Sequence, residues 1–311
     1  MGRTGYDDRQ LTARKKRTFT AGLLILIAMP LTLIAGSFLM DSANYMLISL
    51  LVIIYTMIPF FMIFEKRRPK AREIVLIAMM TAITVACHMF FNMTISVIEI
   101  GTAMVIIAGI AMGPEAGFLV GALARFVCNF FLSQGPWTPW QMFTWGLLGF
   151  IAGLTFSISQ DGKKSSTFHM IMGPVICVFA AVALAYVTYL IIPGNDTTFF
   201  GWRIYVFGAA GLLAGLILQK KRMPADRATL TLFTFLTTVI IYGGILNAAS
   251  LFTMSGMPGT EISWNTLRLM YVSGLPYDLL HAGTAAACML LMGRPMIDKI
   301  ERIKIKYGIY R

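Results

Sequence analysis

The chain has 311 residues, of which 57% are hydrophobic and only 13% are charged, and this balance excludes an ordinary soluble globular domain. Its formal net charge is +12, from 26 Lys and Arg against 14 Asp and Glu. Apolar runs close to the length of a membrane-spanning helix recur from end to end. We therefore expect an all-α, polytopic integral membrane protein.

About ten membrane spans are expected in chain order. They are residues 20–40, 44–64, 73–91, 96–112, 114–132, 139–158, 168–192, 202–219, 229–252 and 268–292. Small residues recur four apart on several of these spans, as in Gly117 with Gly121 and Gly149 with Gly153. Such stripes let helix backbones approach closely in lipid, so they predict tight packing within the molecule.

The distribution of positive charge predicts how the chain is oriented. If the N-terminus is cytoplasmic, every Lys and Arg except Arg125, Arg203 and Arg268 lies in a segment that faces inward. Membrane proteins concentrate Lys and Arg in their cytoplasmic loops. Both termini are therefore predicted to be cytoplasmic. The net charge reflects orientation and contact with anionic lipid, and no nucleic-acid partner is predicted.

Two basic stretches, "EKRRPKAR" (65–72) and "QKKRMPADR" (219–227), divide the chain. The predicted parts are a basic N-terminus with two helices in 1–72, four helices in 73–158, two helices in 159–228, and two helices with a basic tail in 229–311. None of the connections is long enough to form a soluble domain.

Few polar side chains lie inside the predicted spans, and those few are predicted to converge on one outward-facing layer. Charges within a bilayer are costly and usually functional. The members of this layer are Glu99, Arg125, Asn129, Gln141, Trp145, Asn247, Asp278 and His281, with His88 near the same level. Together they predict a polar cavity open to the outside. A structural alternative is that Arg125 only pairs with Asp278 or Glu99 to neutralise charge.

The stretch "SQGPWTPWQMFTWGLLGF" (133–150) places three tryptophans and two prolines between two apolar runs. Proline restricts the backbone, so the side chains of Trp137, Thr138 and Trp140 are expected to be held in fixed positions. Tryptophan offers a flat apolar face and one N–H donor, which suits a planar organic ligand. The stretch predicts a rigid aromatic rim over a binding pocket. The alternative is an ordinary belt of interfacial tryptophans.

Motifs of catalysis and nucleotide binding are absent from the sequence. It contains no H-E-x-x-H, no G-x-S-x-G and no G-x-x-x-x-G-K-[ST]. The four cysteines lie singly within spans, which favours neither a disulfide framework nor a metal site. We expect no enzymatic activity, no cofactor and no metal, and any ATP-driven step would need another chain.

Three stretches resemble the substrate-specific S components of energy-coupling factor (ECF) vitamin transporters. They are residues 121–154, "YGGILN" (242–247) and "LPYDLLHAG" (275–283), and the most specific part is "GPWTPWQM" (135–142). On the span 73–91, the stripe Ala78, Ala82 and Ala86 resembles the alanine motif by which that family's first core helix docks its partner.

This resemblance implies a multi-pass plasma-membrane protein that captures a vitamin-like ligand from outside and works with a transmembrane T component and two ATPases. Trp137, Thr138, Trp140 and Gln141 would lie near the ligand. The family has a six-helix core, so four helices are additional here. Cobalamin or a precursor is the favoured ligand, while folate, riboflavin and a purine-like base stay open.

Two other functions remain open. A self-sufficient secondary transporter or channel would relay protons or ions through Glu99, Arg125, Asp278 and His281. A membrane-embedded enzyme would use Asp278 and His281 as acid and base, but no nucleophile or metal constellation joins these two side chains in the sequence.

Overall fold

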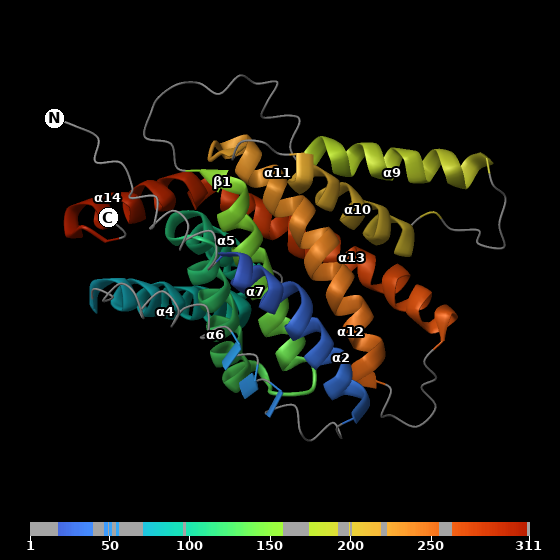
Figure 1. Cartoon of the computed structure of the whole chain (residues 1–311), viewed down its shortest axis with the longest axis horizontal. Helices are drawn as coiled ribbons and strands as arrows, with labels where there is room; N and C mark the ends of the chain where they lie inside the picture. The colour runs from blue at the N-terminus through green and yellow to red at the C-terminus, as the bar shows by residue number, and fades with distance from the viewer. Residues whose placement is uncertain are drawn as a thin grey trace.

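The computed structural model describes residues 18–39, 47–48, 50–51, 54–55, 71–95, 98–157, 174–191, 199, 201–218, 223–254 and 263–309. In chain order the elements are a π-helical segment Leu24–Ala28, α2 (Met29–Leu39), α4 (Ala71–Thr94), α5 (Ile100–Met112), α6 (Pro114–Leu132), α7 (Thr138–Thr155), β1 (Phe156–Ser157), α9 (Pro174–Ile191), α10 (Trp202–Leu218), β2 (Met223–Pro224), α11 (Arg227–Thr237), a π-helical segment Thr238–Gly243, α12 (Gly244–Met254), α13 (Trp264–Cys288), a π-helical segment Met289–Gly293 and α14 (Arg294–Tyr307). The two strands pair in parallel, and the other elements in the described residues are helices (Figure 1).

Helices occupy every predicted span except 44–64, most of which lies outside the described residues. Among the described residues, five helical runs are long and apolar enough to cross a membrane. These runs are Thr18–Gly36, Ala71–Thr94, Pro114–Leu132, Arg227–Leu251 and Trp264–Tyr307. The all-helical membrane architecture is thus supported. The total of ten spans and the cytoplasmic placement of both termini stay predictions.

Two helices end at residues other than the ends of the predicted spans. The helical run expected to end at residue 292 continues to Tyr307, because a π-helical segment carries it from α13 into α14 without a break. The span expected to reach residue 158 ends as a helix at Thr155, where the short parallel strand pair begins. Apolar content alone does not mark either change of backbone conformation.

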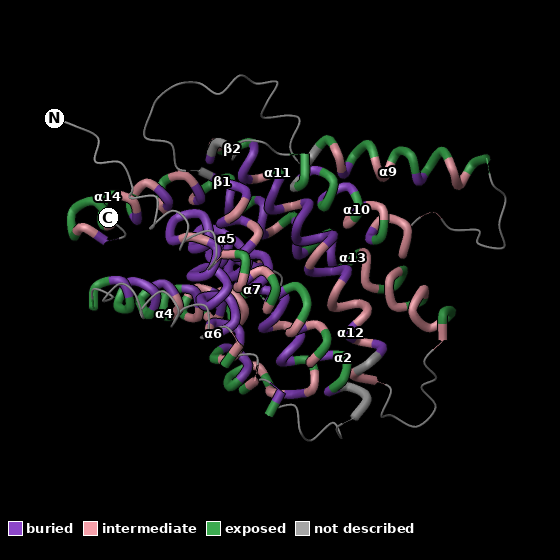
Figure 2. Tube along the Cα trace, in the orientation of Figure 1, coloured by how far each residue is buried: buried purple, intermediate pink, exposed green. Residues whose placement is uncertain are grey.

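Helix α5 forms the centre of the fold. All 13 of its residues are buried, and Figure 2 shows it as a buried element beside α6 and α7, whereas α4 and α9 are exposed along one side. A helix that is apolar all round belongs inside a protein or membrane. At 1.5 Å per residue, α5 is only about 20 Å long. The longer helices therefore pack around a short, buried central helix.

Glycines allow α5, α6 and α7 to cross at backbone contact distance. A Cβ added at Gly109 would clash with the carbonyl oxygen of Gly149, and one added at Gly149 would lie 2.5 Å from the carbonyl oxygen of Gly117. Gly113, which joins α5 to α6, has a φ of 101°, a conformation that favours glycine. The prediction of internal packing from small-residue stripes is confirmed for Gly117 and Gly149.

Replacing Gly149 with alanine is expected to lower the free energy of unfolding by about 3 kcal/mol, the upper end of the usual cost of overpacking, because the clashing atoms belong to backbone. Thermal unfolding in detergent measures this effect. Gly283→Ala is the matched control, since nothing lies within 4 Å of the added Cβ there. The control should be neutral or slightly stabilising. Equal melting temperatures for both variants would contradict the crossing geometry.

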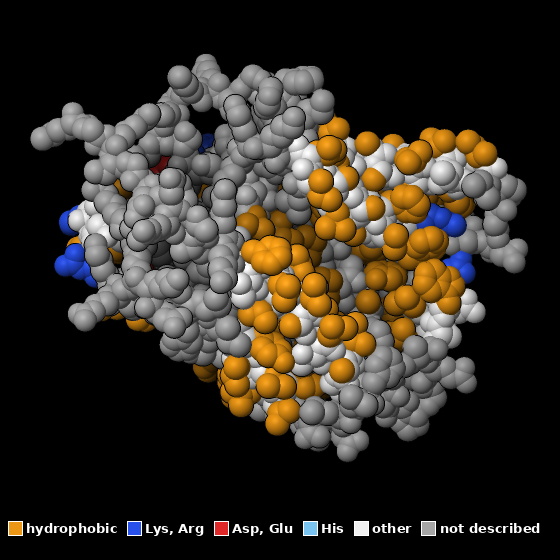
Figure 3. Space-filling view, viewed as in Figure 1, with side chains coloured by type: hydrophobic (Ala, Val, Ile, Leu, Met, Phe, Trp, Pro, Cys, Tyr) orange, Lys and Arg blue, Asp and Glu red, His pale blue; other side chains and the backbone are white. Residues whose placement is uncertain are grey.

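Helices α9 and α10, which the sequence assigns to an insertion, lie at one edge of the molecule (Figure 1). They pack on each other and on the π-helical segment Thr238–Gly243 through a cluster of Val178, Leu212 and Ile240. Their outer surface is largely hydrophobic (Figure 3), with exposed side chains such as Leu184 and Leu213. Such a surface is typical of helices that face lipid.

Helix α14 crosses the ends of three other elements. The Arg294 guanidinium donates to the carbonyl of Ala225 beside α11 at 2.7 Å. The Lys304 ammonium donates to the carbonyl of Ala111 at the end of α5 at 2.6 Å. Near its C-terminus, the carbonyl of Tyr307 accepts a hydrogen bond at 3.1 Å from an arginine in the first turn of α4. These contacts fix the start of α4 relative to the buried core.

Candidate ligand-binding site

The tryptophan-rich turn is held by hydrogen bonds around Thr138. The N–H of Gly135 donates to the Thr138 hydroxyl at 3.1 Å, and the N–H of Thr138 donates back to the Gly135 carbonyl at 2.9 Å. Ser133, which follows α6, has a φ of 130°, a conformation that non-glycine residues rarely adopt. The prediction of a fixed turn is supported by these reciprocal bonds, which hold the start of α7 against the end of α6.

Arg125, Asn129 and Gln141 meet where α6 and α7 pack together. The Gln141 Oε1 atom accepts from Arg125 Nε at 3.0 Å and from Asn129 Nδ2 at 2.9 Å. Asn129 Nδ2 also donates to the Thr138 hydroxyl at 3.0 Å. The sequence placed these side chains on one layer, and the structure brings them into direct contact.

Trp145 lies beneath this group and is fully buried. The Arg125 guanidinium stacks over its ring at 5.0 Å, and the His88 ring meets it edge to face with a centroid distance of 5.0 Å. This packing requires a glycine at position 101, because a Cβ there would lie 2.6 Å from the Trp145 ring. The Trp145 ring is thus the aromatic surface on which the Arg125 and His88 side chains pack.

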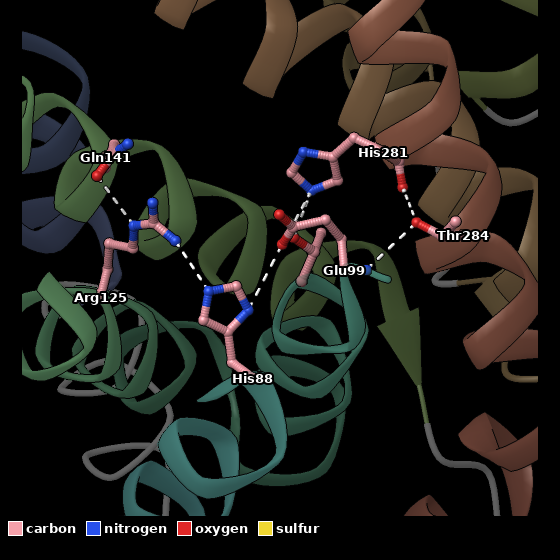
Figure 4. A network of polar contacts seen from close by, with 7 residues as sticks. His88, Glu99, Arg125, Gln141, His281 and Thr284 are labelled. Carbon is pink, nitrogen blue, oxygen red and sulfur yellow. Dashed lines mark hydrogen bonds and ion pairs between the residues drawn. The ribbon is translucent and has the colours of Figure 1, made fainter. Parts of the chain in front are cut away.

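His88 connects Arg125 to Glu99 (Figure 4). Arg125 Nη1 lies 3.2 Å from His88 Nε2, and His88 Nδ1 lies 3.5 Å from Glu99 Oε2. Arginine has no acceptor, so Nε2 accepts and the ring proton sits on Nδ1, facing the carboxylate. Direct pairing of Arg125 with Glu99 was one part of the structural alternative, and the structure instead links the two through a histidine.

On its other side, Glu99 faces α13 (Figure 4). His281 Nε2 lies 3.8 Å from Glu99 Oε2 and 2.9 Å from the hydroxyl of Thr102. The Thr284 hydroxyl donates to the His281 carbonyl at 3.0 Å and accepts from the Glu99 N–H at 3.3 Å. Five helices, α4 to α7 and α13, thus contribute to one continuous network.

Asp278 and Asn247 do not join this network. Asp278 Oδ2 accepts from the hydroxyl of Tyr205 on α10 at 2.6 Å and from Asn247 Nδ2 on α12 at 2.7 Å. Among the described residues, the predicted polar side chains thus form two hydrogen-bonded clusters, and α13 carries a member of each, Asp278 and His281. Whether they share one membrane layer stays a prediction. Tyr205 was missed because nothing in an apolar run marks one tyrosine as a partner for a distant aspartate.

The two other predicted tryptophans differ in position. Trp137 is 42% exposed and sits at the turn, as an aromatic rim requires. Trp140 is buried in an apolar cluster with Phe118, Phe143 and Met29. The structure thus places Trp140 in an apolar cluster, and its predicted role in the ligand rim stays a prediction.

The described side chains of the network offer hydrogen-bond donors and acceptors but no nucleophile with an adjacent base. No three His, Cys, Asp or Glu side chains among the described residues are grouped so as to hold a metal ion. The arrangement is therefore suited to binding a polar or aromatic ligand. Whether a cavity opens from it to the outside, as the sequence predicts, stays a prediction.

Residues 68–202 match the family model described as "ECF-type riboflavin transporter, S component". A search of curated proteins gave no match, and a search of solved structures gave none either. The matched segment contains α4 to α7 and hence most of the network. Together with the long apolar helices, the match indicates a multi-pass plasma-membrane protein that binds a transported substrate and is not an enzyme. Residues 68–202, somewhat less than half of the chain, are therefore similar to the S components of ECF transporters.

Proposed function

We propose that this substrate-binding subunit captures a vitamin with a flat, conjugated ring system from outside the cell and delivers it with a T component and two ATPases. The observation that carries the proposal is the buried network of Arg125, His88 and Glu99 around Trp145, with the exposed Trp137 on the turn above it. A preformed site of aromatic surface and few polar groups is typical of small-molecule binding.

Two classes of ligand can be tested directly. Riboflavin is named in the description of the matching family. Cobalamin, or its benzimidazole precursor, is favoured by the resemblance of the "GPWTPWQM" turn to relatives of that kind. Titration of the purified protein with riboflavin, cobalamin and 5,6-dimethylbenzimidazole separates these possibilities. If none of the three binds with micromolar affinity or better, the proposed ligand class is wrong.

Replacing Trp137 with alanine is expected to weaken binding of whichever probe binds by about tenfold, because loss of an aromatic contact of about 1.5 kcal/mol corresponds to that factor. The fold should tolerate the change, since Trp137 is exposed. Trp264→Ala is the matched control: it removes an exposed tryptophan at the start of α13, away from the network. Equal affinities for both variants would argue against an aromatic rim.

The partner assignment is supported by the surface of α4. Ala78, Ala82 and Ala86 all lie on its exposed face, while the opposite face buries Met80 and His88. Small residues on a lipid-facing stripe allow another helix to approach closely. We propose that this stripe docks the T component.

Uptake assays distinguish this proposal from a secondary transporter. For an ECF subunit, uptake by cells requires the T component and both ATPases. Uptake that persists without the ATPases and collapses with an uncoupler would favour the secondary transporter instead. The structure places three residues of that alternative, Glu99, Arg125 and His281, in one network and Asp278 in another.

A further inference from the structure

Within the part of the chain that the structure describes, four buried polar atoms of the network have no hydrogen-bond partner. They are His88 Nδ1, Glu99 Oε2, Trp145 Nε1 and His281 Nδ1. The residues that carry them are at least 94% buried, so bulk water does not solvate these atoms. An unpaired buried donor or acceptor costs about 1–3 kcal/mol. A cluster of such atoms therefore indicates that a bound ligand supplies the missing hydrogen bonds.

Two of the four atoms define what that partner must offer. The Trp145 indole nitrogen only donates, so it needs an acceptor. The Glu99 carboxylate oxygen only accepts, so it needs an N–H or O–H group. His88 Nδ1 and His281 Nε2 lie 3.5 and 3.8 Å from this oxygen, beyond good hydrogen-bond length. The carboxylate thus keeps acceptor capacity that the protein itself does not fill.

The charged group of the site is already engaged. Arg125 donates through Nε to Gln141 and through Nη1 to His88, and its plane stacks on Trp145. A ligand carboxylate or phosphate placed against the unfilled Glu99 oxygen would face a second carboxylate of the same charge. Like charges at short range in a low-dielectric site repel strongly. An anionic group is therefore disfavoured here.

We propose that the ligand inserts a neutral heterocyclic edge into this network, with an acceptor that receives the Trp145 indole N–H and an N–H group that donates to Glu99. The imide edge of a flavin and the two ring nitrogens of a benzimidazole both have this pattern. The inference rests on the proposed function and adds the chemical class of the group that the site recognises.

The test compares riboflavin with 3-methylriboflavin, in which a methyl group replaces the imide hydrogen. Wild-type protein should bind riboflavin about tenfold more tightly than the methylated probe, since a lost hydrogen bond to a charged group is worth about 1.5–3 kcal/mol. Glu99→Gln should reduce this preference, because its neutral amide accepts a hydrogen bond more weakly. If 5,6-dimethylbenzimidazole binds and riboflavin does not, the same comparison is made between 5,6-dimethylbenzimidazole and its N-methyl derivative.

Trp145→Phe removes the indole N–H and keeps an aromatic ring. It should weaken binding of the unmethylated probe about tenfold, whereas Trp264→Phe, at the start of α13 and away from the network, should leave it within twofold. Melting temperature checks that both variants are folded. This inference would be overturned if the wild-type protein bound the methylated and unmethylated probes equally tightly and Trp145→Phe bound the unmethylated probe as tightly as the wild type. The proposed function would stand in that case. Absence of binding by every probe, cobalamin included, would instead refute the proposed ligand class.

Discussion

Replacing Arg125 with methionine is expected to lower the free energy of unfolding by about 3–5 kcal/mol, the usual cost of removing one partner from a buried charged network. The substitution keeps an unbranched side chain of similar reach. It removes the donor from His88 Nε2 and one of the two donors from Gln141 Oε1, which keeps Asn129 Nδ2. It also leaves the buried Glu99 carboxylate without a positive charge in the network.

A double variant identifies the cause of that loss. If the unpaired Glu99 carboxylate causes most of the lost stability, the double variant Arg125→Met, Glu99→Gln should be more stable than Arg125→Met alone. The coupling free energy between the two substitutions is expected to be about 1–3 kcal/mol. Thermal unfolding in detergent, followed by circular dichroism, measures all four proteins of the cycle. Strictly additive effects would show that Arg125 and Glu99 act independently and that His88 does not couple them.

Arg203→Met is the matched control. Arg203 also stacks on aromatic rings, those of Trp202 and Tyr189 at 5.0 and 5.1 Å, but it is only half-buried. A cation–π contact at such a site is worth about 0.5–1 kcal/mol. The control should therefore lose far less stability than Arg125→Met. A similar loss would mean that the stacking, and not the buried network, makes Arg125 important.

Helical periodicity made the centre of the site predictable from the sequence. Arg125 and Asn129 are four residues apart, as are Gln141 and Trp145, and each pair shares a helix face. The two helices are consecutive and joined by a short turn, so they pack antiparallel and bring the two faces together. The same rule separates Trp140 from Trp145, because five residues correspond to about 140° around a helix. That signal was available and places Trp140 on a different helix face from Trp145.

The rest depended on contacts between helices far apart in sequence. Asp278 and His281 are three residues apart, yet the first reaches α10 and α12 while the second reaches α5. Their directions differ by about 60°, and only the packing of α13 decides which neighbour each meets. The contact of Thr102 with His281 could not be predicted for a related reason, since a threonine in an apolar helix usually donates a hydrogen bond to the backbone of its own helix. The π-helical joint before α14 likewise leaves no pattern in an apolar sequence.

Replacing Ala82 with tryptophan is expected to abolish co-purification with the T component and ATP-dependent uptake, while ligand affinity stays within twofold. Ala82 lies at the middle of the exposed alanine stripe on α4, where its methyl group leaves the helix backbone open to a close neighbour. An indole at this position holds a docking helix several ångströms away. The ligand network contacts the other face of α4 through His88, so binding should not change.

Ala183→Trp on α9 is the matched control, because it adds the same bulk to an exposed position on a different apolar helix. Both variants should fold and bind ligand, and only Ala82→Trp should lose its partner in pull-down and uptake assays. Full uptake by Ala82→Trp would place the docking surface elsewhere. Loss of uptake in both variants would show that lipid-facing bulk, and not a specific interface, limits transport. A loss confined to Ala82→Trp would show that one face of α4 serves ligand capture and the opposite face serves delivery.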